Sequence, residues 1–200
     1  MEIKRLFVGK LHTNCYIITC GNETCIVDPG DEEEKILRRT VGQNVTKILL
    51  SHGHFDHIMA ADAIRKKTGA KIYISREDEP MTKNPNINLY TDFNNTAEGF
   101  SPFEADAIYS DTVTVGDTEF EVIKTPGHSN GSICLYADGE LISGDTLFAG
   151  AIGRTDYGSY DEIMRSVWKL MLLDDDVRVH PGHGFSTTIG TERNENPFLR

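Results

Sequence analysis

The chain has 200 residues and carries 31 acidic and 20 basic side chains, so its formal net charge is −11. This length suffices for one domain over residues 1–200 with a core that needs no disulfide. The acidic balance argues against general nucleic-acid binding, which requires clustered lysine and arginine. No apolar run approaches the roughly 20 residues of a membrane span, and no signal-like segment follows residues 1–6. We therefore expect a cytoplasmic protein with no membrane, nucleic-acid or obligate protein partner.

Short apolar runs bounded by turn residues predict ten strands. They cover residues 2–8, 15–19, 24–28, 47–50, 71–74, 112–115, 119–124, 132–136, 140–143 and 177–180. Helical spacing, acidic starts and a glycine stop predict three helices and a further short one after a capping box formed by Ser75 and Asp78. The three longer helices cover residues 31–40, 58–68 and 160–173. Strands bunched with helices in this order indicate an α+β protein in which helices flank two mixed sheets.

Residues 82–111 are the least regular part of the chain, and residues 147–158 read as a second, glycine-rich loop. A long irregular segment in a compact domain is usually functional or mobile. One interpretation of residues 82–111 is a flap over a site, with apolar contacts from its aromatic side chains. The other is that these aromatics only fix the loop to the body of the protein. They are Tyr90, Phe93, Phe100 and Phe103.

The four cysteines show neither Cys-x-x-Cys spacing nor a secretory context. They are Cys15, Cys20, Cys25 and Cys134. Buried, reduced thiols are the interpretation that this pattern favours. A disulfide or redox pair among the first three is the alternative.

Residues 51–57, Ser-His-Gly-His-Phe-Asp-His, carry the strongest chemical signal in the sequence. The segment follows an apolar strand and precedes a helix, so it lies at a strand end. Alternation along an extended chain sends His52 and His54 the same way, where they can hold one ion. Asp56 and His57 lie beyond the bend and can face a second ion. Imidazole and carboxylate ligands suit Zn²⁺, with iron and manganese as alternatives.

Three more residues of ligand type follow predicted strands, each at a turn that contains glycine. They are His128, Asp145 and His183. Two ions could share the complete set. In that arrangement His52, His54 and His128 take one ion, while Asp56, His57 and His183 take the other. Asp145 then bridges the pair.

The pattern His-x-His-x-Asp-His, followed by a distant His, Asp and His, resembles the metallo-β-lactamase superfamily. The resemblance covers nearly the whole chain and is closest to short members of the glyoxalase II-like branch. The segments at residues 144–148, 153–154, 181–184 and 187–198 carry that closer likeness. The resemblance implies a four-layer αββα sandwich and the seven metal ligands named above. Typical β-lactamases of the superfamily carry Cys where Asp145 stands, and flavodiiron members replace His54 with Glu.

The resemblance also implies a reaction. A hydroxide held between two ions would attack a thioester of the hydroxyacylglutathione type, with Asp145 fixing the ion separation and Asp56 orienting the nucleophile. Full-length glyoxalase II proteins continue into a helical domain that helps to hold glutathione, whereas this sequence ends at Arg200. Arg154, Tyr157 and Lys124 are candidates for contacting an anionic small-molecule substrate, and the favoured alternative is that each is a surface or structural residue.

Two alternatives stay open. The first is a persulfide dioxygenase, which would use one iron held by His52, His54 and His128, with Asp145 as a further candidate ligand. The second is a non-catalytic binding module stabilised by metal.

Overall fold

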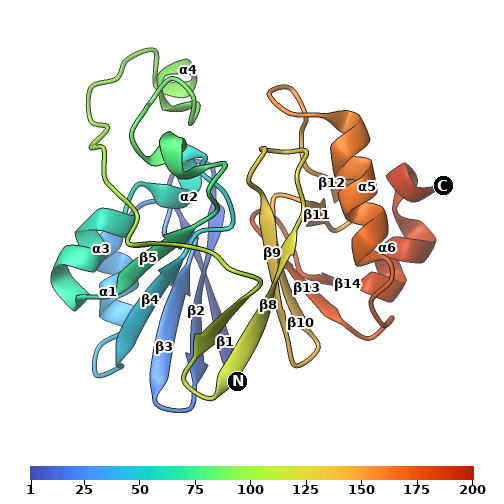
Figure 1. The fold of residues 1–200 in the computed structure, drawn as a ribbon, viewed down its shortest axis with the longest axis horizontal. Helices are drawn as coiled ribbons and strands as arrows, with labels where there is room; N and C mark the ends of the chain where they lie inside the picture. Colours follow the sequence, from blue (N-terminus) through green and yellow to red (C-terminus); the bar gives the residue numbers. More distant parts are fainter.

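A computed structural model describes residues 1–200 and contains two six-stranded sheets (Figure 1). The first sheet takes its strands in chain order: β1 (Glu2–Val8), β2 (Thr13–Cys20), β3 (Glu23–Val27), β4 (Val45–Leu49), β5 (Lys71–Ile74) and β6 (Ala107–Ile108). β1 to β3 pair antiparallel, and β3 to β6 pair parallel. Continuous apolar runs in the parallel strands agree with burial on both faces.

The second sheet is also mixed. Its strands in spatial order are β14 (Thr187–Thr188), β13 (Arg178–Pro181), β10 (Glu140–Gly144), β9 (Ile133–Ala137), β8 (Thr118–Lys124) and β7 (Thr112–Val115). Only β10 and β13 pair parallel. The loop predicted at residues 147–158 contains a small hairpin, formed by β11 (Leu147–Phe148) and β12 (Ala151–Ile152).

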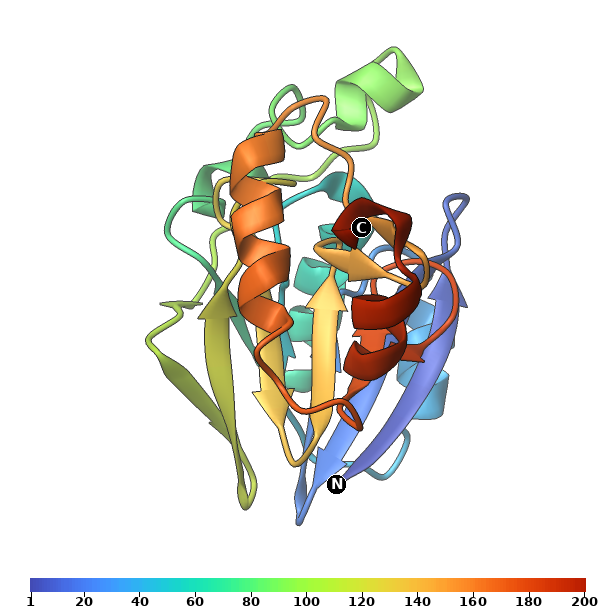
Figure 2. The same cartoon turned by 90° about the vertical axis from the view of Figure 1, so that its right-hand side faces the viewer.

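Helices cover the outer faces of both sheets, which gives the expected αββα order of layers. α1 (Glu33–Arg39) and α3 (Ala61–Thr68) lie on the first sheet (Figure 1). α5 (Tyr160–Leu170) and α6 (Ile189–Glu195) lie on the second, as Figure 2 shows. No helix in the structure has the length and apolar character needed to cross a membrane.

Three apolar clusters occupy the three interfaces between these layers. The first, with Ile36 and Ile64, joins the helices to the first sheet. The second, with Leu49 and Phe120, fills the space between the sheets. The third, with Val167, joins the second sheet to α5 and α6. Burying each large apolar side chain contributes about 1.5–3 kcal/mol, so the clusters fix the two sheets face to face.

The helix predicted at residues 58–68 is interrupted, and the prediction was wrong there. A short helix α2 (Phe55–Ile58) precedes α3, and the N–H of Ala60 donates to the carbonyl of Pro29 at 2.9 Å. This tertiary bond replaces an intrahelical one and lets α2 turn independently. A Cβ on Gly30 would lie 1.5 Å from the Asp56 carbonyl oxygen, so only glycine allows α2 this close.

The segment 82–111 combines the two interpretations made from its sequence. It follows a 3₁₀ turn η1 (Glu79–Thr82) and contains a short helix α4 (Tyr90–Asn94). Phe103 is buried in the first cluster, so it fixes the segment to the body. Tyr90 and Phe93 stack near Phe55 beside the histidine segment, with ring centroids 5.7 and 5.3 Å from it.

Candidate metal centre

All seven predicted ligands converge at one end of the sandwich, where the loops after β4, β8, β10 and β13 meet (Figure 1). The first sheet supplies the histidine segment at residues 52–57. The second supplies His128, Asp145 and His183. The site therefore lies across the seam between the two sheets, and neither sheet carries a complete set of donors.

One group of donors consists of His52, His54 and His128, whose ligand atoms lie within 4.8 Å of one another. His54 Nδ1 and His128 Nε2 are 2.8 Å apart. The nitrogen atom His52 Nε2 is buried and has no hydrogen-bond partner. A buried polar atom without a partner is costly, so this geometry is typical of donors that share a ligand.

A second group consists of Asp56, His57 and His183, again with donor atoms within 4.8 Å. Asp56 Oδ2 lies 3.4 Å from His57 Nε2 and 3.2 Å from His183 Nε2. The two histidine Nε2 atoms are 3.4 Å apart.

Asp145 stands between the two groups. Its Oδ2 lies 3.5 Å from His128 Nε2 and 3.5 Å from His183 Nε2, and its Oδ1 lies 3.6 Å from His57 Nε2. Oδ1 is buried without a hydrogen-bond partner. A Cβ on Gly182 would lie 2.1 Å from this oxygen, so glycine leaves room for the carboxylate. Asp145 therefore contacts both groups, as a bridging residue must.

In three histidines, one ring nitrogen lies within hydrogen-bond distance of another group of the protein. The other ring nitrogen therefore points towards the metal centre. His52 Nδ1 is 3.0 Å from Ser51 Oγ, His57 Nδ1 is 3.0 Å from Asp28 Oδ2, and His128 Nδ1 is 2.8 Å from the Arg154 carbonyl. Partners of this kind fix the tautomer and orientation of metal-binding histidines.

The sequence does not single out Asp28, because this residue ends a predicted strand directly before Pro29. Its side chain is buried and accepts from Ser51 N at 2.7 Å and Ser51 Oγ at 2.6 Å, in addition to His57. Asp28, His52 and His57 also form a compact group. Because these bonds already occupy both Asp28 oxygens, we assign it the role of orienting His57.

Asp78 was also misread. Its backbone N–H bonds to Ser75 Oγ at 3.3 Å, as a capping box requires, but its carboxylate faces away from that turn. The carboxylate accepts from Gly53 N at 2.9 Å, Ser129 Oγ at 2.6 Å and Gly131 N at 2.8 Å. It thereby joins the loops that carry the first group of histidines.

Two residues of strand β2 hold the second group of donors in place by hydrogen bonds. Thr13 Oγ1 donates to Asp56 Oδ2 at 2.9 Å. Asn14 Nδ2 donates to the carbonyls of Pro181 and Gly184 at 2.8 and 3.0 Å, and so holds the loop that carries His183. No local pattern indicates these roles, because β2 reads only as a buried strand.

Comparison with known proteins identifies the family. The profile of the Metallo-beta-lactamase superfamily matches residues 8–183, which include all seven side chains. This chain belongs to that superfamily.

Curated superfamily members match the chain over nearly their whole length. It is 34% identical to the probable metallo-hydrolase YqgX of Bacillus subtilis (strain 168), with 100% of this chain and 98% of that protein covered. It is 33% identical to the hydroxyacylglutathione hydrolase GloC of Haemophilus influenzae, with the same coverage of 100% and 98%.

Solved structures of the superfamily confirm the fold. BLEG-1 B3 metallo-beta-lactamase superposes with a TM-score of 0.93 at 33% identity, covering 99% of both chains. TTHA1623 in a di-iron-bound form gives 0.87 at 33% identity, covering 98% of this chain and 100% of that one. ETHE1 from Myxococcus xanthus gives 0.76 at 26% identity, covering 98% and 84%.

The electrostatics of the centre fit the cation binding of this superfamily. Burial, together with the neighbouring histidines, lowers the pKa of His52 well below its usual range, and it lowers the pKa of His54 to about 3. Both rings are therefore neutral at pH 7, as ligands must be. Burial alone would lower the pKa of His57, but the carboxylates of Asp56, Asp145 and Asp28 outweigh it and raise that pKa to about 10. A cluster that stabilises positive charge so strongly suits divalent ions.

A cleft of about 540 Å³ opens in front of the donors. Leu11, Phe93 and Phe148 supply apolar lining, and Arg154 and Tyr157 lie at its rim. Arg154 Nη2 pairs with Asp156 at 2.6 Å, and Tyr157 Oη donates to Asp92 at 3.1 Å. Lys124 lines a separate cavity and not this cleft, so of the three candidates for contacting a substrate it is the one that the cleft does not include.

Proposed function

We propose that the chain is a dinuclear metal-dependent hydrolase of the glyoxalase II-like branch, acting on thioesters of the hydroxyacylglutathione type. The observation that carries the proposal is the pair of donor groups, His52/His54/His128 and Asp56/His57/His183, joined by Asp145 at the back of an open cleft. The likeness to GloC over the full chain supports the substrate class.

The donor set fits two divalent ions of the first transition row, with zinc first and iron or manganese as alternatives. Two such ions supply a Lewis acid for the carbonyl and a nucleophile that is available at neutral pH. Asp145 would hold the two ions at a fixed separation. Asp56, fixed by Thr13 at 2.9 Å, would orient the nucleophile towards the cleft.

The remaining lining residues would bind and shield the substrate. Leu11, Phe93 and Phe148 make one side of the cleft apolar and would pack against the substrate. Arg154 lies at the rim and forms an exposed ion pair with Asp156. When this ion pair opens, the guanidinium group can bind an anionic substrate. A thiolate leaves without protonation by an acid, so the cleft needs no further proton donor for thioester cleavage.

Metal-resolved elemental analysis with a thioester screen tests this proposal. We expect about two ions per chain and hydrolysis of lactoylglutathione or a simpler thioester. Replacing His54 with alanine should abolish turnover and reduce the metal content. A His54→Ala protein that kept both would refute the assignment. A β-lactam belongs in the same screen, because of the likeness to BLEG-1.

The second candidate is a persulfide dioxygenase, which the likeness to ETHE1 favours. It predicts one iron per chain at His52, His54 and His128, with Asp145 as a further candidate ligand, and oxygen uptake with a persulfide substrate. The second donor group, complete in this structure, favours the hydrolase instead. Full metal occupancy without turnover of any substrate would leave a metal-stabilised binding module.

A further inference from the structure

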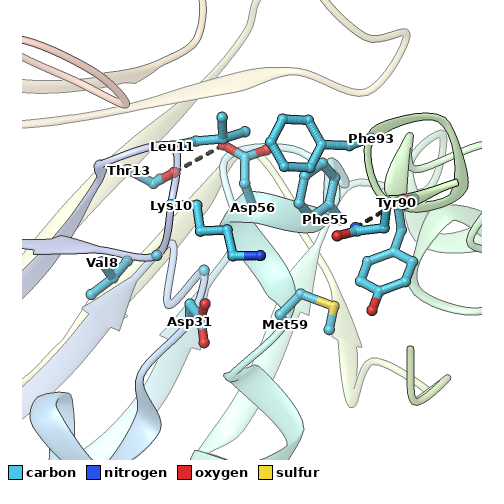
Figure 3. A pocket seen from close by; sticks show the side chains of 13 residues that line it. Val8, Lys10, Leu11, Thr13, Asp31, Phe55, Asp56, Met59, Tyr90 and Phe93 are labelled. Atoms are coloured by element: carbon cyan, nitrogen blue, oxygen red, sulfur yellow. Dashed lines mark hydrogen bonds between the residues drawn. The ribbon is translucent and has the colours of Figure 1, made fainter. Parts of the chain in front are cut away.

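A second cavity of about 200 Å³ adjoins the metal cleft (Figure 3). It lies between the β1–β2 loop, helix α2 and helix α4. Its apolar lining side chains are Val8, Leu11, Phe55, Met59, Tyr90 and Phe93.

The cavity borders the cleft, because Leu11, Phe55, Asp56 and Phe93 line both. Asp56 is the metal-centre residue at this junction, and its Oδ2 is held by Thr13 from the cavity side. A substrate whose reacting carbonyl lies beside the donors can therefore extend one of its arms past Asp56 into the cavity.

One side of the cavity is apolar and aromatic, while Lys10, Thr13, Asp31, Asp56 and Asn94 line the rest. Phe55 is flanked by Phe93 and Tyr90, with ring centroids at 5.3 and 5.7 Å, and Figure 3 shows Met59 and Val8 closing other sides. An apolar cavity of about 150 Å³ holds a benzene ring. The cavity thus has room for one six-membered ring or a chain of about six carbons.

The charges around the cavity favour a neutral arm. Lys10 is exposed, and Figure 3 shows its side chain extending across the pocket above Asp31. The carboxylate of Asp31 offsets the single ammonium group, so a carboxylate on the arm gains little net attraction from these side chains. Apolar burial is the interaction that remains to bind it.

We propose that this cavity is the subsite for a neutral, ring-sized apolar arm of the ester or thioester substrate. The inference rests on the proposed hydrolase function and narrows its substrate class. The arm can belong to the acyl half or to the leaving thiol, since both flank the same carbonyl.

Two pairs of substrates distinguish an apolar arm on the acyl half from one on the leaving thiol. Hexanoyl against acetyl thioesters of N-acetylcysteamine vary the acyl half, and acetyl thioesters of benzyl mercaptan against N-acetylcysteamine vary the thiol. We expect the apolar member of one pair to have at least about tenfold higher kcat/KM, as hydrophobic pockets commonly give. Met59→Trp, which fills the cavity, should bring that ratio close to one. Met164→Trp, at another partly buried methionine, on α5, should leave the ratio unchanged.

A binding measurement keeps this inference separate from the proposed function. In metal-loaded protein, 4-fluorobenzyl alcohol should give a nuclear Overhauser effect to the methyl group of Met59, assigned by its loss in Met59→Leu. If that contact forms and no ester or thioester is cleaved, the function fails and the ligand class of the cavity is upheld. Equal kcat/KM within both pairs, or no contact with Met59, overturns the inference while thioester hydrolysis stands.

Discussion

Side chains that are not themselves candidate ligands fix the orientation of the ligand side chains. Asp28 is the clearest case, because its two oxygens receive Ser51 N, Ser51 Oγ and His57 Nδ1. Through Ser51 it also reaches His52 Nδ1, so one carboxylate orients a histidine in each group. Its φ angle is +49°, a conformation that asparagine adopts more readily than most residues.

Replacing Asp28 with asparagine should therefore weaken metal binding without disturbing the backbone. The amide has one acceptor oxygen and cannot satisfy both Ser51 and His57. We expect a loss of about 10–100-fold in affinity, larger for the ion bound by His57. Competition with a chelator measures it, with Asp106→Asn as a control carboxylate distant from the centre. Unchanged affinity for both ions would show that Asp28 has only a structural role.

The cysteines give a second prediction at this scale. All four are free and buried, as the sequence indicated. Burial raises the pKa of Cys15 well above its usual value and that of Cys134 to about 11. Because the thiolate is the reactive form, a disulfide-exchange reagent at pH 8 should label the folded protein slowly and all four thiols in denaturant. Rapid labelling of any cysteine in the folded protein would contradict this.

At the scale of elements, the turn after β5 sets the distance between two loops from different sheets. Asp78 receives hydrogen bonds from Gly53, next to His54, and from Ser129, next to His128. Burial raises the pKa of this carboxyl group, and the hydrogen bonds only partly offset the effect. Asp78 is buried between these two loops and holds them together.

Asp78→Asn should weaken the ion held by His52, His54 and His128 by about tenfold or more, because one of the bonded groups would face an amide NH₂. The ion held by His57 and His183 should be bound as before. Glu192→Gln is the matched control, since Glu192 is a buried carboxylate that bonds to Gly150 N and Thr187 Oγ1 far from these loops. Chelator titration that resolves the two ions decides the question. Equal weakening of both ions would mean a general loss of structure.

At the scale of the whole molecule, the metal centre connects two halves that also meet through the apolar cluster between the sheets and through the hydrogen bonds of Asn14 and Asp78. Each donor group combines residues from both halves, with His128 or His183 completing what residues 52–57 begin. Ions bound there would act as cross-links that exist only in the folded state.

Removing the metals should therefore lower the melting temperature. An ion present at about 1,000 times its Kd adds about 4 kcal/mol. For a chain of this size that corresponds to about 8–16 °C per ion. Thermal denaturation before and after chelation measures the change, and adding metal back should restore it. Equal melting temperatures with and without metal, at proven occupancy, would show that the ions do not join the two halves.

Most element types, the αββα order of layers and the seven candidate ligands could be predicted from the amino-acid sequence. These features depend on local information: the hydrophobic period, the turn residues, and a density of histidines that is typical of metal ligands. The sequence assigns His52 and His54 to one group because side chains two residues apart point the same way along an extended chain.

How those residues are held depends on the tertiary structure. Asp28, Asp78 and Thr13 act on partners 23 to 53 positions away, and no local pattern distinguishes them from ordinary strand or turn residues. The break between α2 and α3 depends on Pro29 and Gly30, and the exclusion of Lys124 from the cleft depends on how β8 packs. Periodicity reports which way a side chain faces along its own element. Only the packing of one sheet against the other determines what it meets there.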